Sequence, residues 1–155
     1  MIICVQISLL TYFSIQIESG DYMTKEKNYK QLFLELYNKY KHEMFIYPGE
    51  KGQFCSYIDS RVIMLDPDTW ENTNEWMLFA TLHEIGHIKT NTSKMKQYMK
   101  EYLATQWALE ESRRLGFEVS KRIISIYQNY ILDWREKSIK RKAKNVVSKS
   151  ELILH

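Results

Sequence analysis

The chain is poor in the residues that interrupt helices and cross-link small folds. Its 155 residues include only five glycines, two prolines and two cysteines, Cys4 and Cys55. These cysteines have no metal-ligand spacing, and two isolated thiols are typical of a reducing compartment, with a single disulfide as the alternative. With 45% hydrophobic and 26% charged residues, the composition excludes a disordered or fibrous protein and favours one compact, helix-rich domain.

The chain also has little net charge, and its excess of positive charge lies at one end. The formal net charge is +3, yet residues 131–155 alone hold seven Lys and Arg against three acids. The rest of the chain therefore has a net charge of −1. A broad affinity for nucleic acid is not indicated, so nucleic acid is not expected as the main partner. The basic run WREKSIKRKAK can follow phosphates, although such runs are more often solvated helix ends.

No long uninterrupted apolar run is present. The first 17 residues are uncharged but contain five polar side chains, Gln6, Ser8, Thr11, Ser14 and Gln16. The segment lacks the positive residues of a secretory signal and is too polar for a membrane span. We therefore expect residues 1–22 to be an N-terminal strand, or else coding sequence ahead of a true start at Met23. Both alternatives favour a cytoplasmic protein without a membrane partner.

Two kinds of hydrophobic spacing follow one another in the next part of the chain. Residues 29–40 place large apolar side chains at helical intervals with lysines between them, which predicts an amphipathic helix. Residues 45–68 hold short β-favouring runs broken by Pro-Gly, Lys-Gly and Asp-Pro-Asp, which predicts two or three short strands ending in RVIML. We expect that last strand to form the edge of a substrate cleft, or else to be an ordinary core strand.

A helix start signal follows the predicted strands. Asn72 and Glu75 have the spacing of a capping box, in which each side chain bonds a free backbone N–H of the first turn. The helix should then run from Trp76 to about His87 or Lys89, because the next residues, TNTS, are typical of a loop.

Two further helices are expected in the remainder of the chain. The first covers about residues 94–115, with Gly116 as its stop, and the second lies within residues 119–142. The order of a helix, a small sheet and three helices predicts an α+β fold. No repeat or linker divides the chain, so residues 23–134 are expected to form one domain, with residues 135–155 as a basic helix end and tail.

The run WMLFATLHEIGHIKT places two of the chain's four histidines four residues apart. In a helix, His83 and His87 emerge on one face, so both imidazoles can reach one cation at about 2 Å. Glu84 projects beside them and can act on a metal-bound water; H-E-x-x-H on a helix is a metalloprotease signature. Gly86 costs a helix about 1 kcal/mol relative to Ala, which indicates that another group approaches its backbone. The alternative is a pair of core histidines.

A hydrolytic zinc site needs a third protein ligand, and Glu101 is the best candidate. Past His87 the helix continues for about 6 Å, and an antiparallel return climbs about 10 Å to Glu101, at about 1.5 Å per residue. Glu101 should therefore lie between the levels of His83 and His87; its alternative is an exposed helix acid. Glu110 and Glu111 lie too far along and are expected at the surface. Small residues share the face of Glu101 and permit close packing: Ala104, Thr105, Ala108 and Ser112.

TLHEIGH followed by EYLATQWA resembles the ImmA/IrrE family of small gluzincin-type metallopeptidases, common on phages and bacterial mobile elements. The family's second motif reads like E-x-x-A-[ND]-x-[FW]-A, and four residues match it: Glu101, Ala104, Trp107 and Ala108. Thr105 stands where the family often has Asn or Asp, a position suited to hydrogen-bond a ligand histidine.

The resemblance covers about residues 27–116, without the last helix and the basic tail, and it implies a minimal zincin-like metallopeptidase fold for the domain expected over residues 23–134. It implies one Zn²⁺ per chain, held by His83, His87 and Glu101, with Glu84 as general base. The expected function is that of an intracellular zinc metalloendopeptidase whose substrate is a protein or peptide, such as a phage or mobile-element repressor. The alternatives are a non-catalytic zinc-binding regulatory module and a nucleic-acid-associated protein that uses the basic tail.

Overall fold

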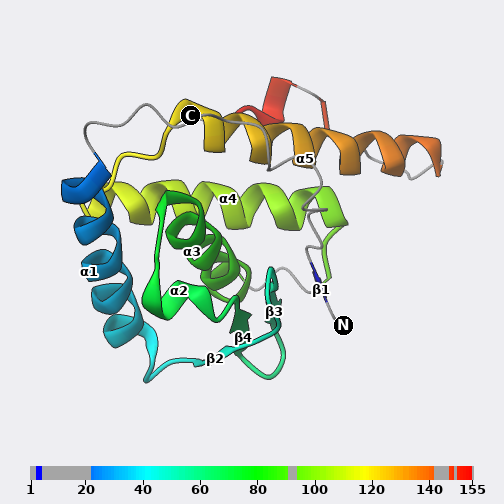
Figure 1. The fold of residues 1–155 in the computed structure, drawn as a ribbon. Coiled ribbons are helices and arrows are strands. Elements are labelled where there is room, and N and C mark those ends of the chain that lie inside the picture. Colours follow the sequence, from blue (N-terminus) through cyan, green and yellow to red (C-terminus); the bar gives the residue numbers. More distant parts are fainter. Residues whose placement is uncertain (1–2, 5–21, 91–93, 142–146, 149, 155) are drawn as a thin grey trace. The chain divides into compact units, whose positions relative to one another are not determined.

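The computed structural model describes residues 3–4, 22–90, 94–141, 147–148 and 150–154 of the chain (Figure 1). Most of the segment expected to be an N-terminal strand or upstream sequence lies outside these residues. The chain divides into two compact units, Met1–Thr81 and Leu82–His155. Within the described ranges, none of the helices combines the length and apolar character that a membrane span requires.

The first unit combines helices with a small mixed sheet, which confirms the predicted α+β class. Its helices are α1 (Tyr22–Tyr40) and α2 (Asp68–Glu71), and α3 begins at its end. Three short strands form the body of the sheet: β2 (Phe45–Pro48), β3 (Phe54–Tyr57) and β4 (Val62–Leu65). The two-residue β1 (Ile3–Cys4) pairs with β3, which gives the strand order β1-β3-β4-β2.

The core of the first unit follows from the predicted helical and strand spacing. On α1, Phe33 and Leu36 are fully buried, and the Phe33 ring meets Trp70 edge-on with centroids 5.5 Å apart. On β4, alternate residues Ile63 and Leu65 are fully buried. Each such side chain contributes roughly 1.5–3 kcal/mol to folding when removed from water.

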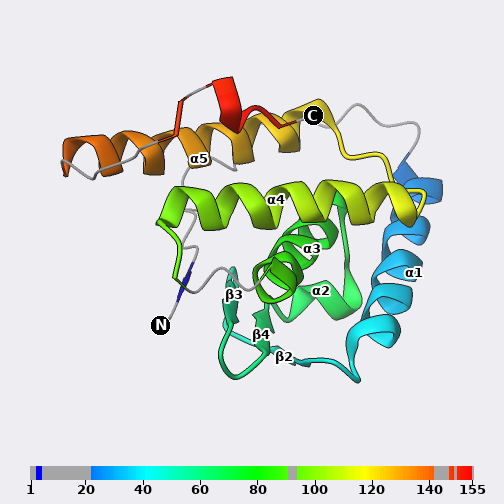
Figure 2. The same ribbon diagram turned by 180° about the vertical axis from the view of Figure 1, so that it is seen from behind.

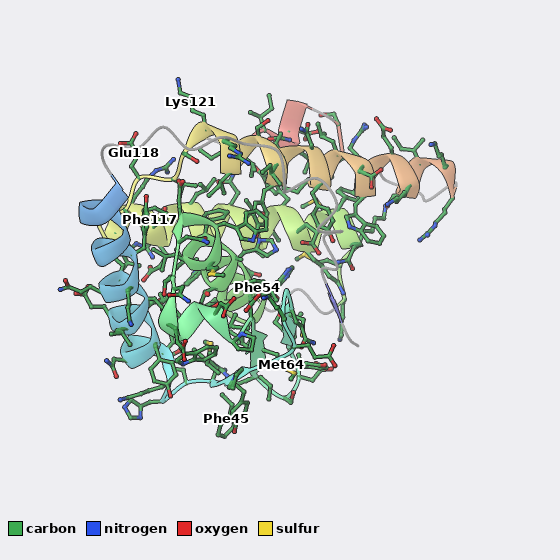
Figure 3. The ribbon with its side chains drawn as sticks, in the orientation of Figure 1. Phe45, Phe54, Met64, Phe117, Glu118 and Lys121 are labelled. Carbon is green, nitrogen blue, oxygen red and sulfur yellow. The ribbon has the colours of Figure 1, made fainter. Side chains whose placement is uncertain are left out.

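The strand in RVIML is not an edge strand. β4 pairs antiparallel with β3 on one side and parallel with β2 on the other, so the prediction that it borders a cleft is wrong. The edge beyond it belongs to β2, where Pro48 has no N–H to offer an added strand. Phe45 projects outward from β2, exposed and stacked on Tyr47 (Figure 3).

The start of α3 (Glu75–Thr90) differs from the predicted capping box. Asn74, rather than Asn72, caps the helix, because its Oδ1 accepts the Met77 N–H at 2.9 Å. Asn72 instead ends α2, a single turn that the sequence did not predict. That turn begins at Asp66, whose carboxylate accepts the N–H of Asp68 at 2.8 Å.

The second unit is built on two long antiparallel helices, α4 (Gln97–Arg114) and α5 (Lys121–Lys140), which lie side by side in both views (Figures 1 and 2). Gly116 stops α4 as predicted, with a φ of +71°. Its N–H bonds the Arg113 oxygen at 3.0 Å and the Phe117 N–H bonds the Ser112 oxygen at 2.8 Å. These two bonds satisfy the last carbonyls of α4 and turn the chain toward α5.

The expected basic tail is partly folded. A short 3₁₀ turn, η2 (Ser150–Leu152), lies against α5, and Leu152 is fully buried. The Gln128 amide donates to the Leu152 carbonyl at 2.9 Å and accepts the Leu154 N–H at 2.8 Å. The end of the described chain is therefore fixed to the middle of α5.

Candidate metal centre

The three motif residues lie within about one turn of one another in the second half of α3. His83, Glu84 and His87 are each no more than 1% exposed, although all three are polar. One potential ligand atom from each lies within 4.8 Å of the others. Buried polar side chains are costly unless they find partners, so this group is suited to hold a cation. The structure thus places a buried His-Glu-His group that could hold a metal ion, as the motif predicted.

Glu101 of α4 reaches the same point from the neighbouring helix. Its Oε2 lies 3.1 Å from Nε2 of His83 and 3.5 Å from Nε2 of His87. The two Nε2 atoms are themselves 3.1 Å apart. Glu101 is fully buried, so its alternative as an exposed helix acid is wrong. Two carboxylates are therefore near the histidines. Oε2 of Glu101 lies within 3.5 Å of both Nε2 atoms, whereas an oxygen of Glu84 lies within 4.8 Å of one nitrogen from each ring.

These three atoms have the spacing of ligands around one tetrahedral ion. A triangle with sides of 3.1, 3.1 and 3.5 Å has its centre about 1.9 Å from each corner. Zinc bonds nitrogen and oxygen at about 2.0–2.2 Å, so an ion slightly to one side of the triangle fits all three distances. Two imidazoles and one carboxylate are also a donor set that catalytic zinc uses, with a fourth position left for another ligand. The residues present therefore fit the expected metal.

Thr105 orients one of the two histidines. Its hydroxyl donates to the main-chain oxygen of Glu101 at 2.7 Å and lies 3.1 Å from Nδ1 of His83. Because the single hydroxyl proton is already used, the oxygen can only accept from His83. The Nδ1 atom therefore carries the ring hydrogen, and Nε2 presents its lone pair to the centre.

The two ligand helices approach each other closely where α3 carries Gly86. A Cβ added at Gly86 would lie 2.5 Å from the main-chain oxygen of Ala104 and 3.1 Å from its Cα. Only glycine allows this approach, which confirms that the glycine marks a close backbone contact. Ala104, Thr105 and Ala108 are fully buried on the same side of α4, as expected from their small size. The close contact brings Glu101 within reach of the histidines.

The charges at the centre stabilise one another. Burial alone raises the pKa of the Glu101 carboxyl. When Nε2 of His83 and of His87 each carry a proton, however, their hydrogen bonds and positive charges outweigh burial and hold that pKa well below its usual range. Burial lowers the pKa of the His87 imidazole, yet the hydrogen bond and charge of Glu101, aided by the charge of Glu84, raise it overall. Two imidazole nitrogens that face one carboxylate repel each other unless a proton or metal ion lies between them. The centre therefore favours a bound cation.

Helix α5 contributes two tyrosines that sequence reasoning did not assign to the site. The Tyr127 ring is buried and lies 4.8 Å, centroid to centroid, from the His83 ring. Burial, and then the negative charges of Glu101 and Glu84, raise the pKa of the half-buried Tyr130, so its phenol stays protonated at neutral pH. Only the helical spacing of Tyr127 in the sequence hinted that it faces inward.

Two more polar residues of α4 were not predicted correctly: Gln97 was not assigned to the site, and Glu111 was expected at the surface. Gln97 donates from Nε2 to Oε1 of Glu101 at 2.5 Å, a contact that its position one turn before Glu101 could have suggested. Glu111, expected at the surface, is buried and accepts from Arg114 at 3.1 Å, whereas Glu110 is exposed as predicted.

Comparisons with known proteins add no family to this geometry. A scan against protein-family models finds no match, and neither the search of curated proteins nor the search of solved structures finds a similar chain. The case for a function therefore rests on the residues of the centre and on their arrangement.

Proposed function

We propose that the protein is a cytoplasmic zinc metallopeptidase with a zincin-like fold of the ImmA/IrrE type. One observation carries the proposal: the buried triangle formed by Nε2 of His83, Nε2 of His87 and Oε2 of Glu101, with sides of 3.1, 3.1 and 3.5 Å. A core histidine pair without a metal role needs neither a converging carboxylate nor a fixed tautomer. The low cysteine content supports a reducing compartment.

Each residue of the centre has a distinct task in this proposal. His83, His87 and Glu101 would hold the zinc, which when bound would lower the pKa of a water and polarise the scissile carbonyl. Glu84, next to His83 on the same turn, takes the proton of the attacking water and passes it to the leaving amine. Thr105 keeps His83 in the tautomer that can bind a metal.

Tyr130 is the residue that we assign to stabilise the developing oxyanion. Its phenol is half-buried, so a substrate can reach it, and the charges of Glu101 and Glu84 act on it. A neutral phenol donates a hydrogen bond to an oxyanion, and a raised pKa keeps that hydrogen in place. The preceding turn of α5 places Tyr127 against His83, which puts this part of the helix beside the centre.

The substrate class in this proposal is a protein or peptide. The resemblance to the ImmA/IrrE family favours one specific regulatory protein, such as a repressor carried by a phage or mobile element. Extended substrate cannot add to β4, because both of its edges are occupied. Substrate recognition is therefore assigned to side-chain contacts rather than to strand addition at RVIML.

A non-catalytic zinc-binding module is the second candidate, and the burial of the site favours it. His83, Glu84 and His87 are at most 1% exposed, and structural zinc sites are closed while catalytic sites keep an open position. In that case the metal holds α3 and α4 together, and Glu84 has no catalytic role.

Two variants separate these candidates. Elemental analysis should find about one zinc per chain in the wild type and in Glu84→Gln, and little in Glu101→Ala, because Glu84 is not assigned as a ligand. The proteins are then incubated with a proteome-derived peptide mixture, and new peptide ends are identified by mass spectrometry. A peptidase produces new ends in the wild type and none in Glu84→Gln. Zinc binding without new ends in the wild type would favour the non-catalytic module.

A further inference from the structure

Gln97 holds the outer oxygen of the proposed third ligand. It is the first residue of α4, one turn before Glu101, and its Nε2 donates to Oε1 of Glu101 at 2.5 Å. The other carboxylate oxygen, Oε2, is the atom that faces His83 and His87. One oxygen of Glu101 thus faces Gln97, and the other faces the two histidines.

This division limits how Glu101 can bind a metal. A free carboxylate can offer one or both oxygens to a cation, and two oxygens would fill the position that a catalytic zinc leaves for water. We propose that Gln97 is a positioning residue that restricts Glu101 to a single oxygen toward the metal. This inference rests on the proposed function, because it assumes that His83, His87 and Glu101 bind zinc.

The surroundings of Glu101 support a positioning role. Thr105, one turn after Glu101, donates to its main-chain oxygen at 2.7 Å, so α4 holds this residue from both sides. A glutamine suits the task because it donates a hydrogen bond without a positive charge, which would compete with the metal for the carboxylate. Gln97 is only half-buried, so its replacement leaves no cavity in the core.

The test is a metal titration of Gln97→Met, which keeps the size of the side chain and removes the donor. Gln106→Met is the matched control, because Gln106 lies on the same helix and its amide donates to the Ile153 carbonyl at 3.4 Å rather than to Glu101. Zinc affinity is measured by competition with a chelator, and the absorption spectrum of the cobalt(II)-substituted protein reports the number of ligands. Neither readout depends on peptidase activity.

We expect Gln97→Met to bind zinc about 10–100-fold more weakly than the wild type, the usual effect of losing a partner of a metal ligand. Its cobalt spectrum should weaken in the visible range, because a second oxygen from Glu101 raises the coordination number. Gln106→Met should match the wild type in both measurements. If Gln97→Met does not fold by circular dichroism, Gln97→Asn, too short to reach Oε1, carries the same expectations.

The outcomes separate this inference from the proposed function. If the wild type binds neither zinc nor cobalt, the metallopeptidase proposal itself is refuted. A wild type that binds both, with Gln97→Met equal to it in affinity and spectrum, would overturn the role of Gln97 alone. Weaker zinc binding with an unchanged cobalt spectrum would also overturn it, because Gln97 would then only stabilise the start of α4.

Discussion

Replacing Gly86 with alanine should weaken both the fold and the metal centre. The added Cβ would lie 2.5 Å from the Ala104 main-chain oxygen, whereas ordinary contacts begin near 3.4 Å. The added Cβ and the Ala104 oxygen are each attached to a helix backbone, which cannot move aside as the end of a flexible side chain can. To restore a contact of 3.0–3.4 Å, α3 and α4 must therefore separate by roughly 0.5–0.9 Å. Overpacking of this kind costs about 3 kcal/mol, and the higher helix propensity of alanine returns about 1 kcal/mol. The expected net loss is about 2 kcal/mol.

The assays are urea unfolding, thermal unfolding and zinc titration of Gly86→Ala. A loss of about 2 kcal/mol should lower Tm by roughly 4–8 °C in a protein of this size. The separation also draws Glu101 from the histidines, and ligands must be held within about 0.5 Å, so zinc affinity should fall at least about 10-fold.

Gly116→Ala is the matched control for this prediction. Gly116 also needs its glycine, but for its φ of +71°, and an added Cβ there meets nothing within 4 Å. That substitution should cost about 1–2 kcal/mol without changing zinc affinity. A Gly86→Ala variant that is more stable than the wild type, with unchanged zinc affinity, would refute the close contact between α3 and α4.

Three further predictions concern the centre itself. Thr105→Val keeps the shape of the side chain but removes the acceptor for His83, so zinc affinity in a chelator competition should fall about 10–100-fold. Tyr130→Phe should lower kcat by roughly 100-fold or more on any cleaved peptide while zinc affinity stays unchanged; an equal loss of zinc would contradict the assigned role. Burial lowers the pKa of His87, but Glu101 raises it overall, so protons should displace zinc at a higher pH than at an ordinary histidine. A zinc titration at decreasing pH checks this, since affinity should fall as the pH drops through that raised pKa.

The elements that position the site were predictable because their signals are local. The spacing of His83 and His87 depends only on the helical repeat, and the level of Glu101 follows from the rise per residue of two antiparallel helices. Gly86 stood out because glycine is unfavourable inside a helix unless a neighbour needs the space. The distances of 3.1 and 3.5 Å to Glu101 agree with that reasoning.

The errors arose where distant parts of the chain decide the outcome. ENTNEW offers two asparagines of similar capping ability, and the turn that begins at Asp66 uses Asn72 to end α2, which leaves Asn74 to begin α3. The interior position of β4 depends on its parallel pairing with β2, and alternation of side chains along one strand does not reveal its neighbours.

The roles proposed for Gln97 and Tyr130 could not be predicted from the sequence. The spacing of Gln97 one turn before Glu101 could suggest a contact between the two side chains, but it does not show which oxygen of Glu101 the amide reaches. Tyr130 is one of eleven tyrosines, and only the packing of α5 distinguishes it from the others.

The threonine at position 105 ties the protonation pattern of the centre to the integrity of a helix. The side-chain oxygen of an asparagine or aspartate carries no hydrogen. It can therefore accept a hydrogen bond from an imidazole without help from a backbone carbonyl. A threonine hydroxyl accepts there only while the carbonyl of Glu101 takes its proton, and that carbonyl is in position only while this turn of α4 is intact. If the turn unwinds, the hydroxyl can rotate and His83 is free to exchange tautomers. Local melting of one helical turn would thereby loosen the hold of the centre on any cation bound there.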